Sequence, residues 1–166
     1  MRERTVRILL AGLGIPAAVI GVWSAFAPRS FYEDFPGFGQ LWVRPDGPFN
    51  EHLVRDVGEL NLALAFVTLA AVLWCTPLLV RLVAGAWLVE GIPHLVYHLR
   101  HLDPLTSDAK VSSIAGLAIV PVVALVLLAL ETDRGRSGAT IGRSGSRSPV
   151  ASGSASTVPR ARSSSA

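Results

Sequence analysis

Long apolar runs separated by short polar segments fill the first 130 residues of the chain. Three runs carry almost no charge, at residues 8–26, 78–96 and 111–130. A fourth, at residues 60–74, is shorter but continues a helical pattern back to Asn50. At about 1.5 Å per helical residue such segments can cross a hydrocarbon core of about 30 Å. We therefore predict an all-α fold, a bundle of four transmembrane helices at about residues 8–26, 51–74, 78–99 and 111–130.

The ends of the second and third predicted helices are marked by short-range signals. Asn50 can cap free backbone N–H groups, and Glu51 suits the positive end of the helix dipole. Only Cys75, Thr76 and Pro77 separate the two helices. Because this turn is short, we expect the second and third helices to be antiparallel neighbours.

An aromatic-rich segment, residues 28–50, follows the first helix. It holds six of the chain's aromatic residues, with several Pro and Gly residues between them. Aromatic rings favour the membrane interface, so we expect this loop at the outer mouth of the bundle. It would serve there either as an interfacial anchor or as a lid over a site.

Composition supports a membrane protein and defines a separate tail. The chain is 51% hydrophobic and only 16% charged, with a mean hydropathy of +0.47. Residues 131–166 are rich in Ser, Gly and Arg and lack an apolar period, which predicts a disordered tail after a transmembrane domain at residues 1–130. There is no basic, aromatic-interleaved face of the kind that binds nucleic acid.

Basic residues predict the orientation in the membrane. Arginines are more numerous on the side that holds the N-terminus, residue 81 and the tail, so both termini should lie in the cytoplasm of a multi-pass cell-membrane protein. The first segment also resembles a secretory signal, with Ala25 and Ala27 as the small residues of a cleavage site. Retention as a helix and cleavage are both open, and both place residue 28 outside.

Polar residues within the second and third helices form two faces. If the helices pair through their short turn, Glu59 lies level with His94, and Asp56 lies level with His98. Each face is narrow, because helical residues advance by about 100°. The residues of the second helix are His52, Arg55, Asp56 and Glu59, and those of the third are Glu90, His94, Tyr97, His98 and His101.

The spacing of these residues is compatible with a ligand or metal site. Histidines at i and i+4 share one side of a helix, and a nearby carboxylate can complete a coordination sphere or fix a ring tautomer. A metal ion or haem could be held by such N and O ligands. The ligand- or metal-binding candidates are Glu59, Glu90, His94, His98, Asp56 and His52.

A purely structural interpretation is also open. Ionisable groups in membranes usually face the interior and pair with one another, and Arg55 could form ion pairs with Asp56 or Glu59. The outermost residues, such as His52 and His101, could be wet interfacial groups. The chain has no HExxH motif and no Cys pair, and it identifies no catalytic residue.

Two segments, NEHLVRDVGELNLALAFVTLAAV and WLVEGIPHLVYHLRHLD, carry a resemblance to a known group. With them, residues 8–130 resemble small four-helix membrane proteins of unknown activity found in actinobacteria, loosely similar to the DoxX-like group. The resemblance implies a four-helix fold and a membrane location. It implies no catalytic residues.

Three functions fit the sequence. The first is a non-enzymatic membrane protein whose polar site between the second and third helices binds a metal ion, haem or a small ligand. The second is an accessory or interaction subunit, engaging a membrane protein partner or a second copy, whose polar residues are structural. The third is quinone-linked redox or proton transfer, with Glu90 or His94 as the proton group and the aromatic loop as a lid.

Overall fold

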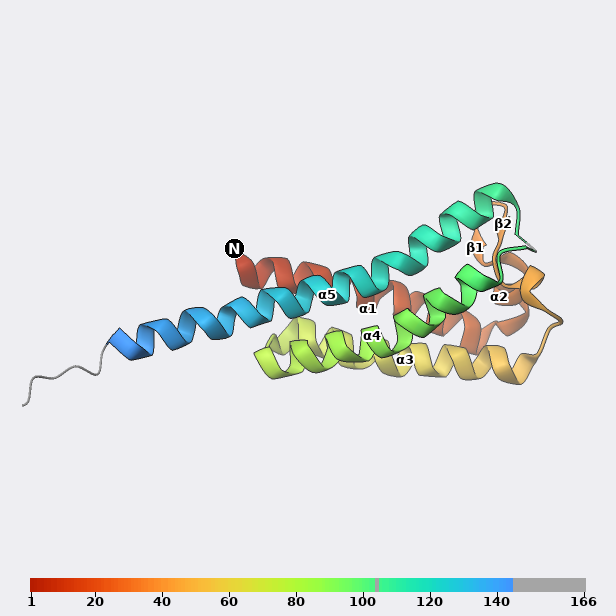
Figure 1. Cartoon of the computed structure of the whole chain (residues 1–166). Coiled ribbons are helices and arrows are strands. Elements are labelled where there is room, and N and C mark those ends of the chain that lie inside the picture. Colours follow the sequence, from red (N-terminus) through yellow and green to blue (C-terminus); the bar gives the residue numbers. More distant parts are fainter. Residues whose placement is uncertain (104, 145–166) are drawn as a thin grey trace, which may run out of the picture.

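The protein is an all-α bundle of long helices, as the sequence predicts (Figure 1). The computed structural model describes the backbone of residues 1–103 and 105–144 and the side chains of residues 1–103 and 105–131. The elements in chain order are α1 (Arg2–Phe26), α2 (Pro28–Asp34), β1 (Pro36–Gly37), β2 (Gln40–Leu41), the 3-10 helix η1 (Arg44–Asp46), α3 (Glu51–Trp74), α4 (Pro77–Arg100) and α5 (Ser107–Ser144).

Four of these helices are long and apolar enough to cross a membrane. They are Arg2–Phe26, Glu51–Trp74, Pro77–Arg100 and the Ser107–Glu131 part of α5. The predicted helix positions are confirmed to within a few residues, except that α1 begins at Arg2 rather than near residue 8. The predicted tail overlaps the end of α5, whose backbone is helical to Ser144. Residues 145–166 lie outside the described residues, and their disorder stays a prediction.

Helices α1 and α3 form a closely packed pair because small residues line their contact. A Cβ atom added at Gly58 of α3 would lie 2.4 Å from the backbone N of Ala25 in α1. One added at Gly21 of α1 would lie 2.9 Å from the backbone N of Leu62. These distances leave no room for a side chain, so the two backbones approach as they do in small-residue helix pairs of membranes.

Helices α4 and α5 form a second pair. Gly91 of α4 is buried against Val120 and Pro121 of α5. Val80, Ala84 and Trp87 of α4 enter the same apolar core as Ala124 and Leu127 of α5. The bundle is therefore two helix pairs, α1 with α3 and α4 with α5.

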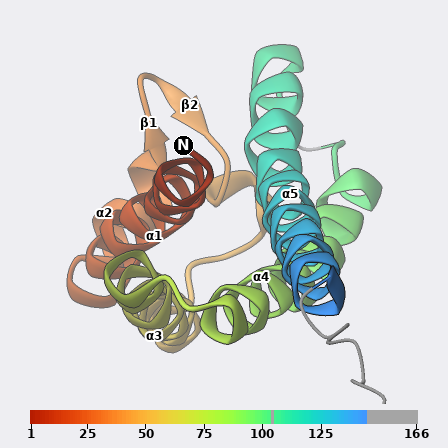
Figure 2. The same ribbon diagram turned by 90° about the vertical axis from the view of Figure 1, so that its left-hand side faces the viewer.

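The two pairs meet at one end of the molecule and separate toward the other. About halfway along α4, the indole Nε1 of Trp87 donates to Thr68 Oγ1 at 3.0 Å in a fully buried contact. Beyond it, α4 leaves α3 and follows α5 (Figure 1, Figure 2). The predicted antiparallel hairpin is present, but its helices are neighbours only in the half nearest the turn.

Arginine side chains cover helix ends at both ends of the bundle. Arg7 donates to the carbonyl oxygens of Val72 and Leu73 at the C-terminus of α3. Arg55 donates to the carbonyl of Ala25 at the C-terminus of α1. Such carbonyls have no partner within the helix and carry its negative partial charge, so each arginine stabilises the end of the neighbouring helix.

The aromatic loop packs as a bridge between the pairs. Trp23 of α1 contacts Phe35, and Phe35 contacts Trp42 edge to face at 5.5 Å between ring centroids. The ring of Trp42 lies over Gly116 of α5, and Ser112 of α5 donates to the side-chain oxygen of Gln40. The loop thus joins α1 to α5 at the end of the bundle opposite the Cys75 turn, where the helix pairs are otherwise apart.

Candidate functional site

The closest pairing among the predicted site residues joins Glu90 and His94 on α4. His94 Nδ1 lies 2.8 Å from Glu90 Oε1, one helical turn apart. The two side chains are partly exposed, 39% for Glu90 and 45% for His94. The i, i+4 spacing of the sequence produces this contact directly, because such residues stack on one face of a helix.

Pro93 adds a third polar group beside this pair. A proline inside a helix has no N–H to donate to the carbonyl four residues earlier. The carbonyl oxygen of Val89 therefore lacks its usual helical donor, one position from Glu90. A carboxylate, an imidazole and a backbone carbonyl are thus gathered within one turn.

Aromatic and imidazole rings continue from this pair toward the outer end of α4. The rings of His94 and His98 are 4.9 Å apart between centroids. Tyr97 contacts the ring of His98 at 5.3 Å and stacks on that of His101 at 4.2 Å. Asp46 in η1 is close enough to His98 for their charges to interact. We call the series Glu90, His94, His98 and His101 the α4 ladder.

The α4 ladder begins deep in the span. At about 1.5 Å per residue, Glu90 lies about 15 Å along the axis from Arg100 and about 20 Å from Pro77. A span crosses a hydrocarbon core of about 30 Å. Glu90 thus stands near the middle of the span, whereas His98 and His101 stand at its C-terminal end.

The α3 candidates form their own short-range pairs. His52 Nδ1 lies 3.4 Å from Asp56 Oδ1, with the His52 side chain almost fully exposed. Arg55 pairs with Glu51 at 2.8 Å, rather than with the Asp56 or Glu59 partners considered from sequence. The side chain of Glu59 is exposed on the surface of α3.

The structure does not bring the α3 and α4 candidates together. No hydrogen bond or ion pair joins Glu59 to His94, or Asp56 to His98, in residues 1–103 and 105–131. The expected contacts between these residues assumed that α3 and α4 stay side by side over their full length. In its C-terminal half, however, α4 leaves α3 (Figure 1). In that same part of the chain no three His, Cys, Asp or Glu side chains are placed to hold one metal ion.

Other polar contacts that matter were not identified from the sequence. Thr68 and Trp87 are buried and bonded to each other, and Gln40 and Ser112 join the loop to α5. An isolated Thr or Gln in an apolar or aromatic segment gives no periodic signal. Only the presence of a hydroxyl and an indole at similar distances from the turn could have suggested the first pair.

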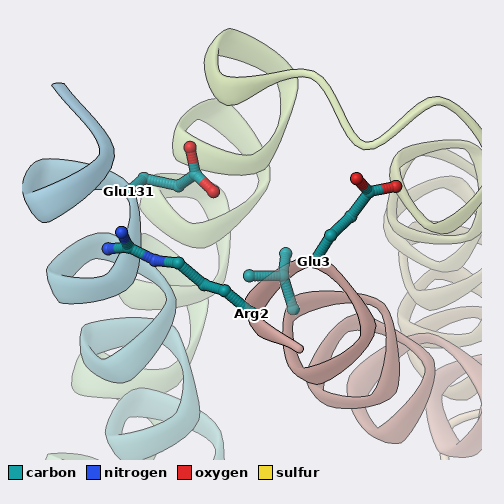
Figure 3. Close-up of a pocket in the computed structure, with 4 residues that line it drawn as sticks. Arg2, Glu3 and Glu131 are labelled. Carbon is teal, nitrogen blue, oxygen red and sulfur yellow. The ribbon is translucent and has the colours of Figure 1, made fainter. Parts of the chain in front are cut away.

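A second polar cluster lies at the opposite end, where α1 begins (Figure 3). A small cavity of about 110 Å³ is lined by Arg2, Glu3, Val6 and Glu131. Arg2 reaches to α5 and donates to the carbonyl of Leu130, and Arg81 Nη2 donates to the carbonyl of Glu131 at 3.0 Å. These arginines bind helix carbonyls of α5, so we interpret this cluster as structural.

Comparison with known proteins adds no family to this description. No family model, curated protein or solved structure matches the chain. The resemblance to DoxX-like membrane proteins therefore stays a prediction.

Proposed function

We propose that this protein is a multi-pass cell-membrane protein that binds a small hydrogen-bonding ligand at Glu90 and His94. Its termini lie in the cytoplasm, and the open end of the bundle lies outside. One observation carries the proposal: a carboxylate–imidazole pair, more than a third exposed, stands near the middle of a membrane span. Exposed ionisable groups at this depth are costly, so a molecule that pairs with them is favoured there.

The polar groups define the chemistry of this ligand. Glu90 and the Val89 carbonyl accept hydrogen bonds, and His94 can donate or accept one. A ligand with both donors and acceptors on an otherwise apolar body suits these groups and their position between lipid and protein. Haem is one ligand of this kind, because it is largely apolar and can take a histidine as its axial ligand.

The test is to identify the metals and small molecules that remain bound to the purified protein. The full chain is extracted in mild detergent, and its metal content, visible spectrum and bound small molecules are measured, the last by mass spectrometry of a solvent extract. We expect a bound molecule near one per chain in wild type and at least about a tenfold loss in Glu90→Gln and His94→Ala, matching the removal of a charge-assisted hydrogen bond. Glu59→Gln removes a carboxylate elsewhere and should keep the molecule.

One combination of results would contradict ligand binding at Glu90 and His94. If nothing is bound in wild type, and Zn²⁺, haemin and a short-chain quinone all leave its thermal unfolding temperature unchanged, the ligand proposal is wrong.

Glu59 favours a second candidate function, that of an interaction subunit. This carboxylate is exposed within the span of α3, on a surface that neither α1 nor α4 covers. In lipid it would be stabilised by a membrane protein partner or a second copy that supplies a donor. Glu59→Gln should then reduce recovery of a complex in native gels while Glu90→Gln leaves it intact, and equal recovery of both variants would count against it.

A further inference from the structure

We propose that the α4 ladder carries protons between the water outside the bundle and Glu90, and that Glu90 exchanges protons with that side alone. This goes beyond ligand binding, because it depends only on the residues of α4 and their surroundings. The geometry supplies two reasons.

The first reason is the continuity of the ladder. His94 Nδ1 already contacts Glu90 Oε1 at 2.8 Å, within direct proton-transfer distance. The His94 and His98 rings, 4.9 Å apart between centroids, are separated by a distance that one hydrogen-bonded water can bridge. The stacked Tyr97 and His101 extend the series to the end of the helix.

The second reason is that nothing continues the series inward. Residues 8–26 of α1, 60–74 of α3, 82–89 of α4 and 111–130 of α5 contain no Asp, Glu, His, Lys or Arg. One and two turns inward from Glu90, Trp87 and Val83 are buried in the apolar core. Between Glu90 and Arg81, α4 carries no ionisable side chain, and the nearby Thr68 hydroxyl already accepts a hydrogen bond from Trp87.

Several groups act on the charge of the ladder at His98. The partial burial of His98 and the neighbouring His94 and His101 act against the protonated form, and Asp46 of η1 acts in the opposite sense. Among the described side chains, Asp56 and Glu59 of α3 form no hydrogen bond or ion pair with the ladder, and Asp108 and Lys110 lie in the first turn of α5. The apolar run of α1 contributes no titratable group.

The transfer conserves charge and atoms. A hydronium ion outside gives its proton to His98, and through water the proton reaches His94 Nε2. His94 then releases its Nδ1 proton to Glu90 Oε1 and returns to the neutral form. The net change is one proton moved from outer water to the Glu90 carboxylate.

A carbodiimide reports this event, because it reacts with a carboxylic acid in its protonated form. The acid adds across a C=N bond of the reagent, its proton goes to nitrogen, and the O-acylurea rearranges to a stable N-acylurea. The full chain is reconstituted into phosphatidylcholine and phosphatidylglycerol vesicles, and trypsin cleavage in the arginine-rich tail identifies its orientation. Labelling of the peptide that contains Glu90 is then followed by mass spectrometry while the pH is changed on one side only.

We expect labelling to rise about tenfold per pH unit of acidification on the side opposite the tail, as the protonated fraction of an ionised carboxyl does, and to be unaffected by pH on the tail side. Glu90→Gln abolishes labelling of this peptide, and Glu59→Gln leaves it intact. In a variant with both His94→Ala and His98→Ala, the response to a rapid pH change should slow about 100-fold.

Two results would overturn the proposal. The first is labelling that follows the pH of the tail side, or of both sides equally, in wild type, a measurement that needs no variant to fold. The second is a His94→Ala, His98→Ala protein with wild-type thermal stability that responds as fast as wild type. Since no bound molecule is required, failure of the ligand proposal and failure of this one are separate.

Discussion

At the scale of single residues, the fold depends on glycines whose missing Cβ lets backbones touch. Gly58 is the sharpest case, since an added Cβ would meet the backbone of Ala25 and the hydroxyl of Ser24. Backbone atoms cannot rotate away as a flexible side chain can. The closeness of α1 and α3, and with it the position of Arg55 over the end of α1, depends on this residue.

Gly58→Ala should destabilise the protein by about 1–3 kcal/mol, the usual cost of forcing extra volume into a packed contact. The measurement is the thermal unfolding transition in detergent, followed by tryptophan fluorescence. Gly12→Ala is the matched control, because a Cβ there meets nothing within 4 Å. It should leave stability unchanged or raise it by up to about 1 kcal/mol through better helix propensity. Equal losses in both variants would refute the close contact.

At the scale of elements, the helices are held together by arginines that cap the ends of neighbouring helices, as well as by side-by-side packing. Arg7 illustrates this: it forms an ion pair with Glu3 at 2.8 Å within α1 and donates to two carbonyls at the end of α3. In the sequence, Arg7 serves only as one of the basic residues that predict the orientation. Its role as a cap of the neighbouring helix depends on how α1 lies along α3.

Arg7→Ala should cost about 1–2 kcal/mol, the size of charge-assisted hydrogen bonds and dipole contacts at a partly exposed site. The same thermal unfolding measurement applies. Arg4→Ala is the control, since Arg4 has the same charge, lies within one turn and is exposed. A loss for Arg4→Ala as large as that for Arg7→Ala would mean that net charge, rather than capping, is responsible.

At the scale of the whole molecule, two helix pairs are joined by a buried bond halfway along α4 and by the aromatic loop at the end of the bundle opposite the Cys75 turn. The buried bond from Trp87 to Thr68 connects α4 to α3, and the loop with Gln40 and Trp42 connects α1 to α5. Between these connections the outer half of α4 stands away from α3, which leaves the α4 ladder accessible.

Thr68→Val keeps the volume of the side chain but leaves the Trp87 indole N–H without its buried acceptor. We expect a loss of about 1–2 kcal/mol together with a change in tryptophan emission. Thr68→Ser retains the hydroxyl and should preserve the emission spectrum. If Thr68→Val shows the spectrum and stability of wild type, this bond does not join the pairs.

The sequence by itself determined the number of spans, most of their limits and the residues of the candidate site. Apolar length defines a transmembrane helix, Asn50 caps α3 by accepting from the Leu53 N–H at 3.2 Å, and the i, i+4 spacing alone brings His94 to Glu90. Each of these depends on residues close together in the chain. Local periodicity is sufficient to predict them.

Only the tertiary structure decided which helices are neighbours, and this separated the residues that the hairpin register had paired. A short turn fixes the start of a hairpin, but small residues draw α3 to α1, and Gly91 with Pro121 draws α4 to α5. Packing between surfaces far apart in the sequence therefore outweighs the turn in the outer half. Glu59 lies outside the site for this reason, and the polar face of α4 is left open as the place where chemistry is to be sought.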